Sequence, residues 1–347
     1  INSPKQLGVI LFERLQLPVI KKTKTGYSTD AKVLEALEGK HPLIATILEH
    51  RKLAKLQSTY LEGLQPLINP KTGRIHTHFQ QTVTGRLSST DPNLQNIPAR
   101  TEEGRQIRRI FVPGAGYDLL MSCDYSQVEL RILACIAQDE LLLEAFRHGQ
   151  DIHARTAAEV FGVPLEEVTP QMRSRAKAVN FGIVYGISDF GLAKQLDVGR
   201  KEAAGYIDSY FERYTGVKKY MEDIVAKARE QGYVSTLMGR RRYLPEIRSS
   251  NFNLRSFAER TAINTPIQGT AADIMKKAMI AVQRELDKAQ CKSRILLQVH
   301  DELVLEVTED EKEQVAQLVR TAMEGAASLD IPLLADVNCG RDWAETK

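Results

Sequence analysis

Residues 173–186, RSRAKAVNFGIVYG, carry side chains whose types and spacing could bind a nucleotide. If this stretch is helical, a spacing of four residues places Arg173, Lys177, Phe181 and Tyr185 on one slowly precessing stripe. The two cations could hold phosphate groups, and the two aromatic rings that follow could contact a sugar and a base. An ordinary amphipathic helix with a solvated basic end and a buried aromatic end has the same pattern, so both interpretations stay open.

Asp124 is a second candidate for chemistry because of its place along the chain. Residues 118–123 are typical of a strand buried on both faces, and the sequence from Glu129 onward is typical of a helix. A carboxylate at the end of a buried strand is costly unless a cation compensates its charge. Asp124 is therefore interpreted either as a metal ligand or as the N-cap of the following helix.

The segment RILLQVHDELVLEV has two apolar runs around His300, Asp301 and Glu302, a pattern that predicts a tight β-hairpin. An exposed Asp301 at its tip would be ordinary, because Asp tolerates turn conformations. If Asp124 lies on a neighbouring strand, however, the two carboxylates could hold two divalent cations roughly 3.5 to 4 Å apart. Such ions would activate a 3′-hydroxyl and stabilise a leaving pyrophosphate, and magnesium suits a site with few carboxylates and several phosphate oxygens.

The elements that must position these residues form a mixed pattern of helices and strands. Residues 1–65 predict helices joined by basic loops, and Ser3-Pro4 is a helix start signal. Residues 74–79 alternate like a strand, and residues 84–100 predict an extended loop rich in hydrogen-bonding groups. Residues 131–246 predict mostly helix. The C-terminal part predicts a helix interrupted or restarted near Pro266, then the hairpin, a final helix over 312–327 and a strand over 332–340.

The composition is that of a globular protein without a strong overall charge. The net charge of +3 does not by itself indicate nucleic-acid binding, so any basic surface must be local. A length of 347 residues suggests two or three subdomains. The four cysteines form no C-x-x-C pair, which indicates neither a zinc site nor a disulfide framework and fits a reducing cytoplasm. No apolar run approaches the roughly 18 residues of a membrane helix, and an initial Ile1 suggests a piece of a longer protein.

Some polar residues have ordinary structural explanations as well as functional ones. Two basic clusters, around residues 21–24 and 51–55, are solvated surface by default, and phosphate contact is the sharper alternative. His153, taken alone, is typical of a satisfied structural histidine.

Together the motifs resemble one known family. DYSQVELR, RSRAKAVNFGIVYG and VHDE resemble, in this order, the three signature motifs of the family A DNA polymerases. TGRLSSTDPNLQNIP and NTPIQGTAAD resemble two further segments of that family, so the resemblance covers essentially the whole chain. It implies an α+β right-hand polymerase fold: a palm with an antiparallel β-sheet, helical fingers and a partial helical thumb. The implied boundaries are thumb 1–65, palm 66–130 and 248–347, and fingers 131–247.

The resemblance also implies a catalytic centre. Asp124 and Asp301 would bind two Mg²⁺ ions, for which Mn²⁺ can substitute, with the carbonyl of Tyr125 in reach and Glu302 in support. Lys177 would be the candidate proton donor to the leaving pyrophosphate.

For the nucleotide, the resemblance implies that Arg173, Lys177 and His153 hold the triphosphate of a dNTP. Phe181 would pack by the sugar and Tyr185 would cover the base of the nascent pair. Glu129 would crowd the 2′ position and accept a hydrogen bond from Tyr185, and Gln127 would also belong to the dNTP site.

For primer–template DNA, the resemblance implies that Arg86 and Gln268 donate to minor-groove acceptors. Every base pair presents such acceptors, so this contact checks pair shape without reading sequence. The other residues implied to contact DNA are Asn93, Gln95, Arg100, Arg260, Asn264 and His300.

The implied function is a template-directed DNA polymerase that extends a primer with dNTPs in replication and repair, as a monomer in the bacterial cytoplasm near the nucleoid, without a membrane. One alternative is a truncated fragment that binds primer–template DNA with little or no turnover. Another alternative is an RNA polymerase or reverse transcriptase of the same architecture. Glu129 and Phe181 argue against an RNA polymerase, because the resemblance implies that they select deoxynucleotides. Because the chain begins inside the implied thumb, we expect weak DNA retention and low processivity. Because the given sequence has nothing upstream of that thumb, we also expect no exonuclease activity.

Overall fold

The computed structural model describes residues 1–24, 26–99 and 101–347. Contacts divide the chain into two compact units: Ile1–His76 with Arg100–Ile107, and Thr77–Ala99 with Arg108–Lys347. Arg100, one of the residues predicted to contact DNA, lies outside the described residues. No helix in the described part of the chain is long and apolar enough to cross a membrane.

The first unit is largely helical and has its own core. Its helix α1 (Pro4–Gly8) begins as predicted, with Pro4 in the first turn and the Ser3 hydroxyl accepting from the N–H of Gln6. Helix α2 (Ala31–Glu35) and the longer α3 (Pro42–Leu56) follow a two-residue ribbon, β1 (Lys22–Thr23) with β2 (Gly26–Tyr27). The core consists of apolar side chains from these helices and the segments next to them, including Leu7, Leu11, Val33, Leu34, Ile44 and Ile47.

Two predicted basic clusters of this unit are partly engaged within the chain. Lys52 pairs with Glu103 at 2.9 Å, Lys21 pairs with Asp30 at 3.2 Å, and Arg51 donates to the carbonyl of Thr29. These three cations therefore have intrachain partners.

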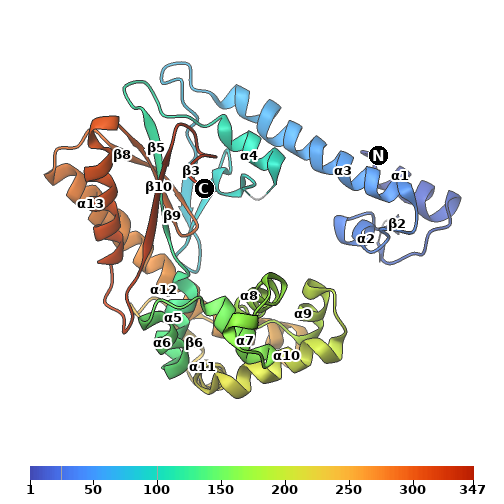
Figure 1. Cartoon of the computed structure of the whole chain (residues 1–347). Helices are drawn as coiled ribbons and strands as arrows, with labels where there is room; N and C mark the ends of the chain where they lie inside the picture. Colours follow the sequence, from blue (N-terminus) through green and yellow to red (C-terminus); the bar gives the residue numbers. More distant parts are fainter. Residues whose placement is uncertain (25, 100) are drawn as a thin grey trace. The chain divides into compact units, whose positions relative to one another are not determined.

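A four-stranded antiparallel sheet forms the centre of the second unit (Figure 1). The strand order is β10-β5-β9-β8, and all neighbours are antiparallel. The strands are β5 (Leu119–Tyr125), β8 (Arg294–Val299), β9 (Glu302–Val307) and β10 (Ala335–Gly340). The predicted buried strand, the tight hairpin and the C-terminal strand are confirmed. The strand predicted over 74–79 begins later, as β3 (His78–Gln81), which pairs with β4 (Leu87–Thr90).

The two faces of the sheet differ because side chains alternate along each strand. Cys123, Leu303 and Leu305 belong to the main hydrophobic core, which they share with side chains of α13 (Lys312–Glu324). Residues one position away along the strands therefore project from the opposite face. Asp124 belongs to that opposite, polar face.

Seven helices, α5 to α11, occupy the chain between β5 and the next ribbon, β6 (Tyr233–Ser235) with β7 (Arg241–Tyr243), and Figure 1 shows them gathered at one end of the sheet. This confirms the mostly helical prediction for residues 131–246. The helices are α5 (Val128–Ala137), α6 (Glu140–Arg147), α7 (Ile152–Phe161), α8 (Pro170–Val184), α9 (Asp189–Leu196), α10 (Arg200–Arg213) and α11 (Thr215–Gln231).

Helix α12 (Phe252–Lys288) runs unbroken for 37 residues, so the predicted interruption near Pro266 is wrong. A proline inside a helix costs about 3 kcal/mol or more, because it removes one hydrogen bond and its ring crowds the preceding turn. Burial offsets this cost here, because Pro266 and Ile267 are both buried. Tertiary packing therefore overrides the local signal.

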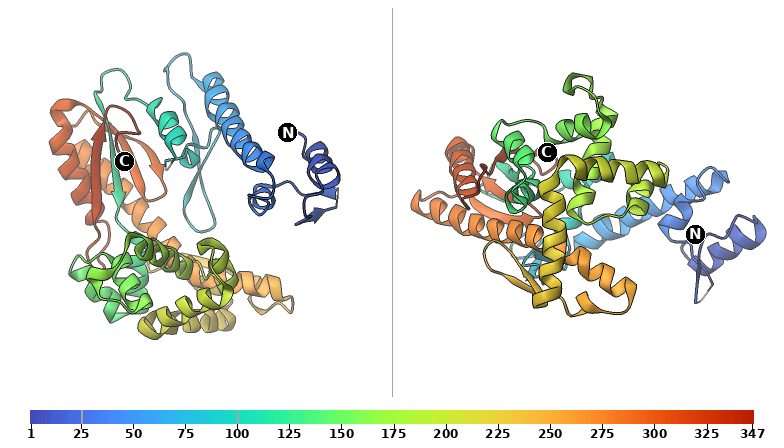
Figure 2. Two further views of the ribbon diagram at one scale, coloured as in Figure 1. Left: turned by 45° about the vertical axis from the view of Figure 1, so that its right-hand side comes forward. Right: turned by 90° about the horizontal axis from the view of Figure 1, so that it is seen from below.

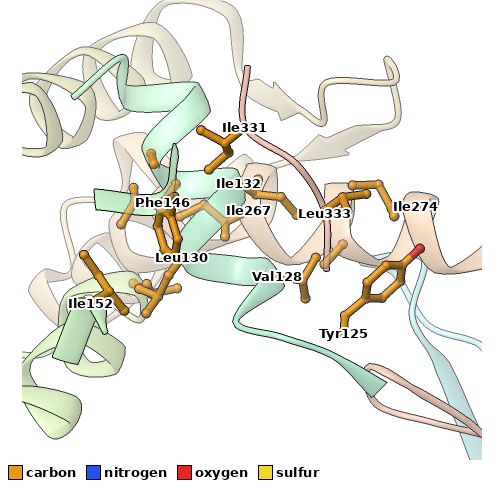
Figure 3. Close-up of a cluster of buried hydrophobic side chains, with 14 of the residues drawn as sticks. Tyr125, Val128, Leu130, Ile132, Phe146, Ile152, Ile267, Ile274, Ile331 and Leu333 are labelled. Carbon is orange, nitrogen blue, oxygen red and sulfur yellow. The ribbon is translucent and has the colours of Figure 1, made fainter. Parts of the chain in front are cut away.

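The apolar contact between α5 and α12 joins the helical region to the sheet. Figure 3 shows Val128, Leu130 and Ile132 of α5 near Ile267 and Ile274 of α12. The two further views in Figure 2 show α12 and α13 beside the sheet. One continuous core thus holds the end of β5 in a fixed relation to α12.

Candidate active site

A row of three carboxylates crosses the polar face of the sheet. Asp124 on β5 lies directly opposite Glu302 on β9 and Asp336 on β10. Residues directly opposed on neighbouring strands project from the same face, so the three acidic groups are neighbours. Asp336 was not among the predicted site residues: the sequence predicts its strand but not which strand pairs with it.

Asp124 is half-buried and has a cation as its partner. The ammonium of Lys347 lies 2.9 Å from Oδ2 of Asp124 and 2.9 Å from Oε2 of Glu302. Burial raises the pKa of Asp124, and Lys347 opposes that shift. The N-cap interpretation is wrong, because Gln127, with φ +54°, occupies the N-cap position of α5.

Glu302 is buried and its orientation is fixed by donors. Its Oε1 accepts from the Ser122 hydroxyl at 2.6 Å and from the indole N–H of Trp343 at 3.3 Å. Its Oε2 faces Lys347. With both oxygens engaged, Glu302 is suited to support Asp124 more than to bind a further ligand.

Asp301 forms the turn of the β8–β9 hairpin together with His300, whose φ is +54°. The backbone carbonyl of Asp301 accepts from the N–H of Tyr125 at 3.0 Å, which ties the turn to the end of β5. Burial raises the pKa of Asp301 to about 6, and the carboxylates of Glu129 and Asp124 add to this. Within the described residues its carboxylate has no hydrogen-bond or ion-pair partner.

The donors at this end of the sheet fit a magnesium ion that completes its shell with substrate. Among the described residues, no cluster of three or more His, Cys, Asp or Glu side chains could hold a metal alone. Asp124 and Asp301 supply two carboxylates, and the hydrogen bond from the N–H of Tyr125, the residue after Asp124, to the carbonyl of Asp301 holds the two segments together. Mg²⁺ prefers such a partial set, because it keeps waters or phosphate oxygens in its remaining positions.

The predicted cation and aromatic stripe lies on α8 and at its end. Arg173 and Lys177 are exposed, Phe181 is half-buried, and Tyr185 is the C-cap, one residue beyond the helix, with 43% exposure. The aromatic end is therefore partly exposed, whereas the simple amphipathic interpretation requires it to be buried. In this structure Arg173 pairs with Asp151 through a 2.6 Å contact between Nε and Oδ2.

His153, on α7, is buried beside the stripe. Its ring lies 5.8 Å from that of Phe181, and its Nδ1 is 3.0 Å from the amide nitrogen of Asn180. Burial and, next, the charge of Lys177 lower the pKa of His153 to about 4. At neutral pH the imidazole is uncharged, so it could offer a hydrogen bond but not a charge.

Glu129, in the first turn of α5, joins two other predicted residues, Tyr185 and Arg86. Its Oε2 accepts from the Tyr185 hydroxyl at 3.0 Å, which is the hydrogen bond expected from the sequence, and its Oε1 pairs with the guanidinium of Arg86. Burial and the Glu129 carboxylate raise the pKa of Tyr185 to about 12. Arg86 also lines a small cavity with His300 and Asp301.

Three of the predicted DNA-contacting residues share one face of α12. Arg260 packs against Gly186, Asn264 donates to the carbonyl of Val184 at 3.4 Å, and Gln268 makes a side-chain hydrogen bond with Tyr185. The structure thus brings this face of α12 against the end of α8.

The remaining predicted residues are more dispersed. His300 is exposed in the hairpin turn, and Gln127 is half-buried. Asn93 is exposed and accepts from the N–H of Gln95. Gln95 is buried, and its amide donates to the carbonyl of Gln298 at 3.0 Å, so it links the loop to β8.

An ion pair that was not predicted supports the turn carrying Arg86. Buried Asp273 on α12 accepts from Nε of Arg240 at 2.8 Å and from the Thr236 hydroxyl at 2.8 Å. A Cβ built on Gly85 would lie 2.6 Å from that same Nε, so the Arg240 guanidinium packs against the backbone of the turn. The sequence signals the basic run GRRRYLPEI, but not its partner.

The family model of DNA polymerase family A matches residues 1–345. The chain belongs to DNA polymerase family A. Family A relatives include DNA polymerase I of Bacillus caldotenax and of Bacillus subtilis, each 59% identical over 350 and 349 aligned residues respectively. DNA polymerase I of Pseudomonas aeruginosa is 57% identical over 349 residues. These alignments cover at least 99% of this chain but only 38–40% of each relative, so the chain spans about two fifths of their length.

A solved family A structure has the same fold. The POL domain of Pol1 from M. smegmatis, in complex with DNA primer-template and dNTP, superposes with a TM-score of 0.94 at 51% identity. The match covers 99% of this chain and 61% of the other. The predicted α+β right-hand polymerase fold is thereby confirmed.

Proposed function

We propose that this chain catalyses template-directed extension of a primer 3′ end with dNTPs and releases pyrophosphate. The observation that carries the proposal is the approach of Asp301 to Asp124 at the end of the sheet, where the Asp301 carboxylate, unpaired among the described residues, lies near other carboxylates. Such an arrangement favours a divalent cation. Family membership and the similarity to a polymerase domain solved with primer-template and dNTP support the same function.

In this proposal Asp124, Asp301 and the carbonyl of Tyr125 hold two Mg²⁺ ions, for which Mn²⁺ can substitute. When bound, the ions lower the pKa of the primer hydroxyl and neutralise charge on the transferring phosphoryl group. Glu302 holds its place beside Asp124 through Ser122 and Trp343, and so keeps that carboxylate oriented.

The exposed cations of α8 bind the triphosphate. Arg173 leaves Asp151 to contact phosphate oxygens, since a charge-assisted bond to phosphate replaces the carboxylate it pairs with here. The primer 3′-hydroxyl loses its proton to solvent water and its oxygen bonds to the α-phosphorus. The bond from that phosphorus to the bridging oxygen breaks, and Lys177 gives a proton to the departing pyrophosphate. His153, uncharged, donates one hydrogen bond to a phosphate oxygen.

Residues around Glu129 select the sugar and position the base pair. Glu129 is buried and its Oε2 is held by Tyr185, so it presents a wall where a 2′-hydroxyl would project. Phe181 packs against the sugar, Tyr185 covers the base, and Gln127 completes the pocket.

Arg86 and Gln268 donate to the minor groove of the newly formed pairs, so the pairs of Arg86 with Glu129 and of Gln268 with Tyr185 exchange for contacts to DNA. The other proposed contacts to primer–template are Asn93, Gln95, Arg100, Arg260, Asn264 and His300. We assign residues 1–65 to a partial thumb, 66–130 and 248–347 to the palm, and 131–247 to the fingers, in a chain that acts as a monomer and removes no nucleotides from a 3′ end.

Primer extension with a labelled primer–template tests the proposal. Asp124→Asn and Asp301→Asn are expected to abolish extension by the chain, whereas Asp223→Asn, which changes an exposed carboxylate on α11, leaves it unchanged. Fluorescence anisotropy of the same duplex measures binding separately. Binding without extension by the unsubstituted chain would establish the alternative, a DNA-binding fragment without turnover. Shortening of the primer without dNTPs would contradict the absence of exonuclease activity.

A further inference from the structure

The ammonium of Lys347 occupies a position between two carboxylates of the proposed metal site. It lies 2.9 Å from Asp124 and 2.9 Å from Glu302, and its side chain is 34% exposed. Asp336 adds a third carboxylate to the same row. Among the described residues, Lys347 is the cation that pairs with this row.

The segment that carries Lys347 is firmly packed on the polar face of the sheet. Trp343 is almost fully buried, its backbone N–H donates to the carbonyl of Phe111 at 3.0 Å, and the two rings meet edge to face. The guanidinium of Arg108 stacks 4.2 Å from the Trp343 ring centroid. Thr346 is buried and its hydroxyl donates to the carbonyl of Trp343 at 3.0 Å. The packing of Trp343 and Thr346 therefore holds Lys347 next to the carboxylates.

An ammonium and a divalent ion compete for the same carboxylate oxygen. Like charges this close repel one another, and the repulsion of a divalent ion is twice that of a single charge. Lys347 can retreat without leaving the site, because Oε2 of Glu302 offers a second acceptor. Glu302 cannot follow, since Ser122 and Trp343 hold its other oxygen.

We propose that Lys347 is an internal counter-cation of this carboxylate row. It neutralises Asp124 and Glu302 while no divalent ion is bound, releases Asp124 to an incoming ion, and remains on Glu302. Lys347 thereby weakens the affinity of the site for divalent ions and stabilises the metal-free fold. This inference rests on the proposed role of Asp124 as a metal ligand.

Binding of Mn²⁺ to the chain, measured by the electron paramagnetic resonance signal of free Mn²⁺ without DNA or dNTP, tests the proposal independently of activity. Lys347→Met keeps the length of the side chain and removes the charge. We expect the dissociation constant of Lys347→Met to fall about fivefold, the scale of one partly exposed ion pair. Lys347→Arg keeps the charge and should bind as the unsubstituted chain does.

Lys288→Met is the matched control, because it also removes one lysine paired at close range with a carboxylate, Glu285, on the surface of α12. It should leave Mn²⁺ binding unchanged. The melting temperature in EDTA should fall for Lys347→Met and recover when Mn²⁺ is added.

Two results would overturn the inference in different ways. If Asp124→Asn loses Mn²⁺ binding while Lys347→Met binds as the unsubstituted chain does, the metal site stands and the counter-cation role fails. If Asp124→Asn does not weaken Mn²⁺ binding, the metal assignment of the proposed function fails, and the role of Lys347 fails with it.

Discussion

The hydroxyl of Tyr185 donates a 3.0 Å hydrogen bond to Oε2 of Glu129, so the residue that ends α8 is joined to the first turn of α5. Glu129 is buried, and Arg86 engages its other oxygen. A single carboxylate therefore connects the proposed nucleotide stripe to the turn proposed to contact the minor groove.

Replacing Glu129 tests this connection through sugar selection. Glu129→Ala should raise the ratio of ribonucleotide to deoxynucleotide incorporation efficiency by about 10-fold or more, the scale on which a pocket discriminates small groups. Steady-state kcat/KM for one dNTP and the matching rNTP measures it. Glu129→Gln keeps the bulk of the side chain and should shift the ratio much less. An unchanged ratio in Glu129→Ala would contradict the proposal that Glu129 excludes the 2′-hydroxyl.

The raised pKa of Asp301, about 6 against an ordinary 3.8, predicts a pH-dependent stability. The folded chain holds this proton more tightly than the unfolded chain, so the stability it contributes is present below about pH 4 and is lost as the pH rises through about 6. Asp301→Asn lacks this loss. Its melting temperature in EDTA, relative to that of the unsubstituted chain, should therefore climb across this window, while Asp223→Asn shows no such trend. A constant difference at all pH values would contradict the prediction.

Gly85 should resist substitution for two separable reasons. Its φ is +85°, and a Cβ would lie 2.6 Å from Nε of Arg240. Gly116 has a similar φ of +89° with nothing within 4 Å of its Cβ position, so Gly116→Ala measures the backbone cost alone, about 1–3 kcal/mol. Urea unfolding should show Gly85→Ala to be the more destabilised of the two. Equal losses would mean that Arg240 moves aside freely.

Tyr210 has a fully buried hydroxyl without a hydrogen-bond partner among the described residues. Leaving such a group buried costs about 1–3 kcal/mol. Tyr210→Phe should therefore raise the free energy of unfolding or leave it unchanged. Tyr214→Phe is the matched comparison, since its hydroxyl lies 3.4 Å from that of Thr156, and it should lower the free energy of unfolding. A large loss of stability in Tyr210→Phe would contradict the prediction.

Local patterns were sufficient to predict the elements of the site. The alternation and apolar runs around Asp124 and Asp301 predict β5 and the hairpin, and the period of four predicts α8, because these signals depend on neighbours in the chain. Pro266 shows the limit of such rules, since its burial keeps α12 continuous.

Pairings between distant segments could not be predicted in this way. Asp336, Lys347 and the Arg240–Asp273 pair acquire their meaning only from strand register and packing, which no short motif encodes. Gln95 reads as a free polar loop residue, yet its amide is buried against Gln298. Whether Asp124 caps the following helix likewise depends on where that helix begins, and the sequence does not fix its first residue.

The unbroken course of α12 has a consequence for how this chain can change in length. One residue inserted between Asn264 and Gln268 would turn everything beyond it by 100° and shift it by 1.5 Å. Gln268 and Asp273 would then lose their partners, Tyr185 and Arg240, while Asn264 kept its own. Insertions and deletions should therefore accumulate in turns such as the one at Gly73. The length of α12 should stay constant, because it sets the spacing between the residues that contact the end of α8 and those that contact Arg240.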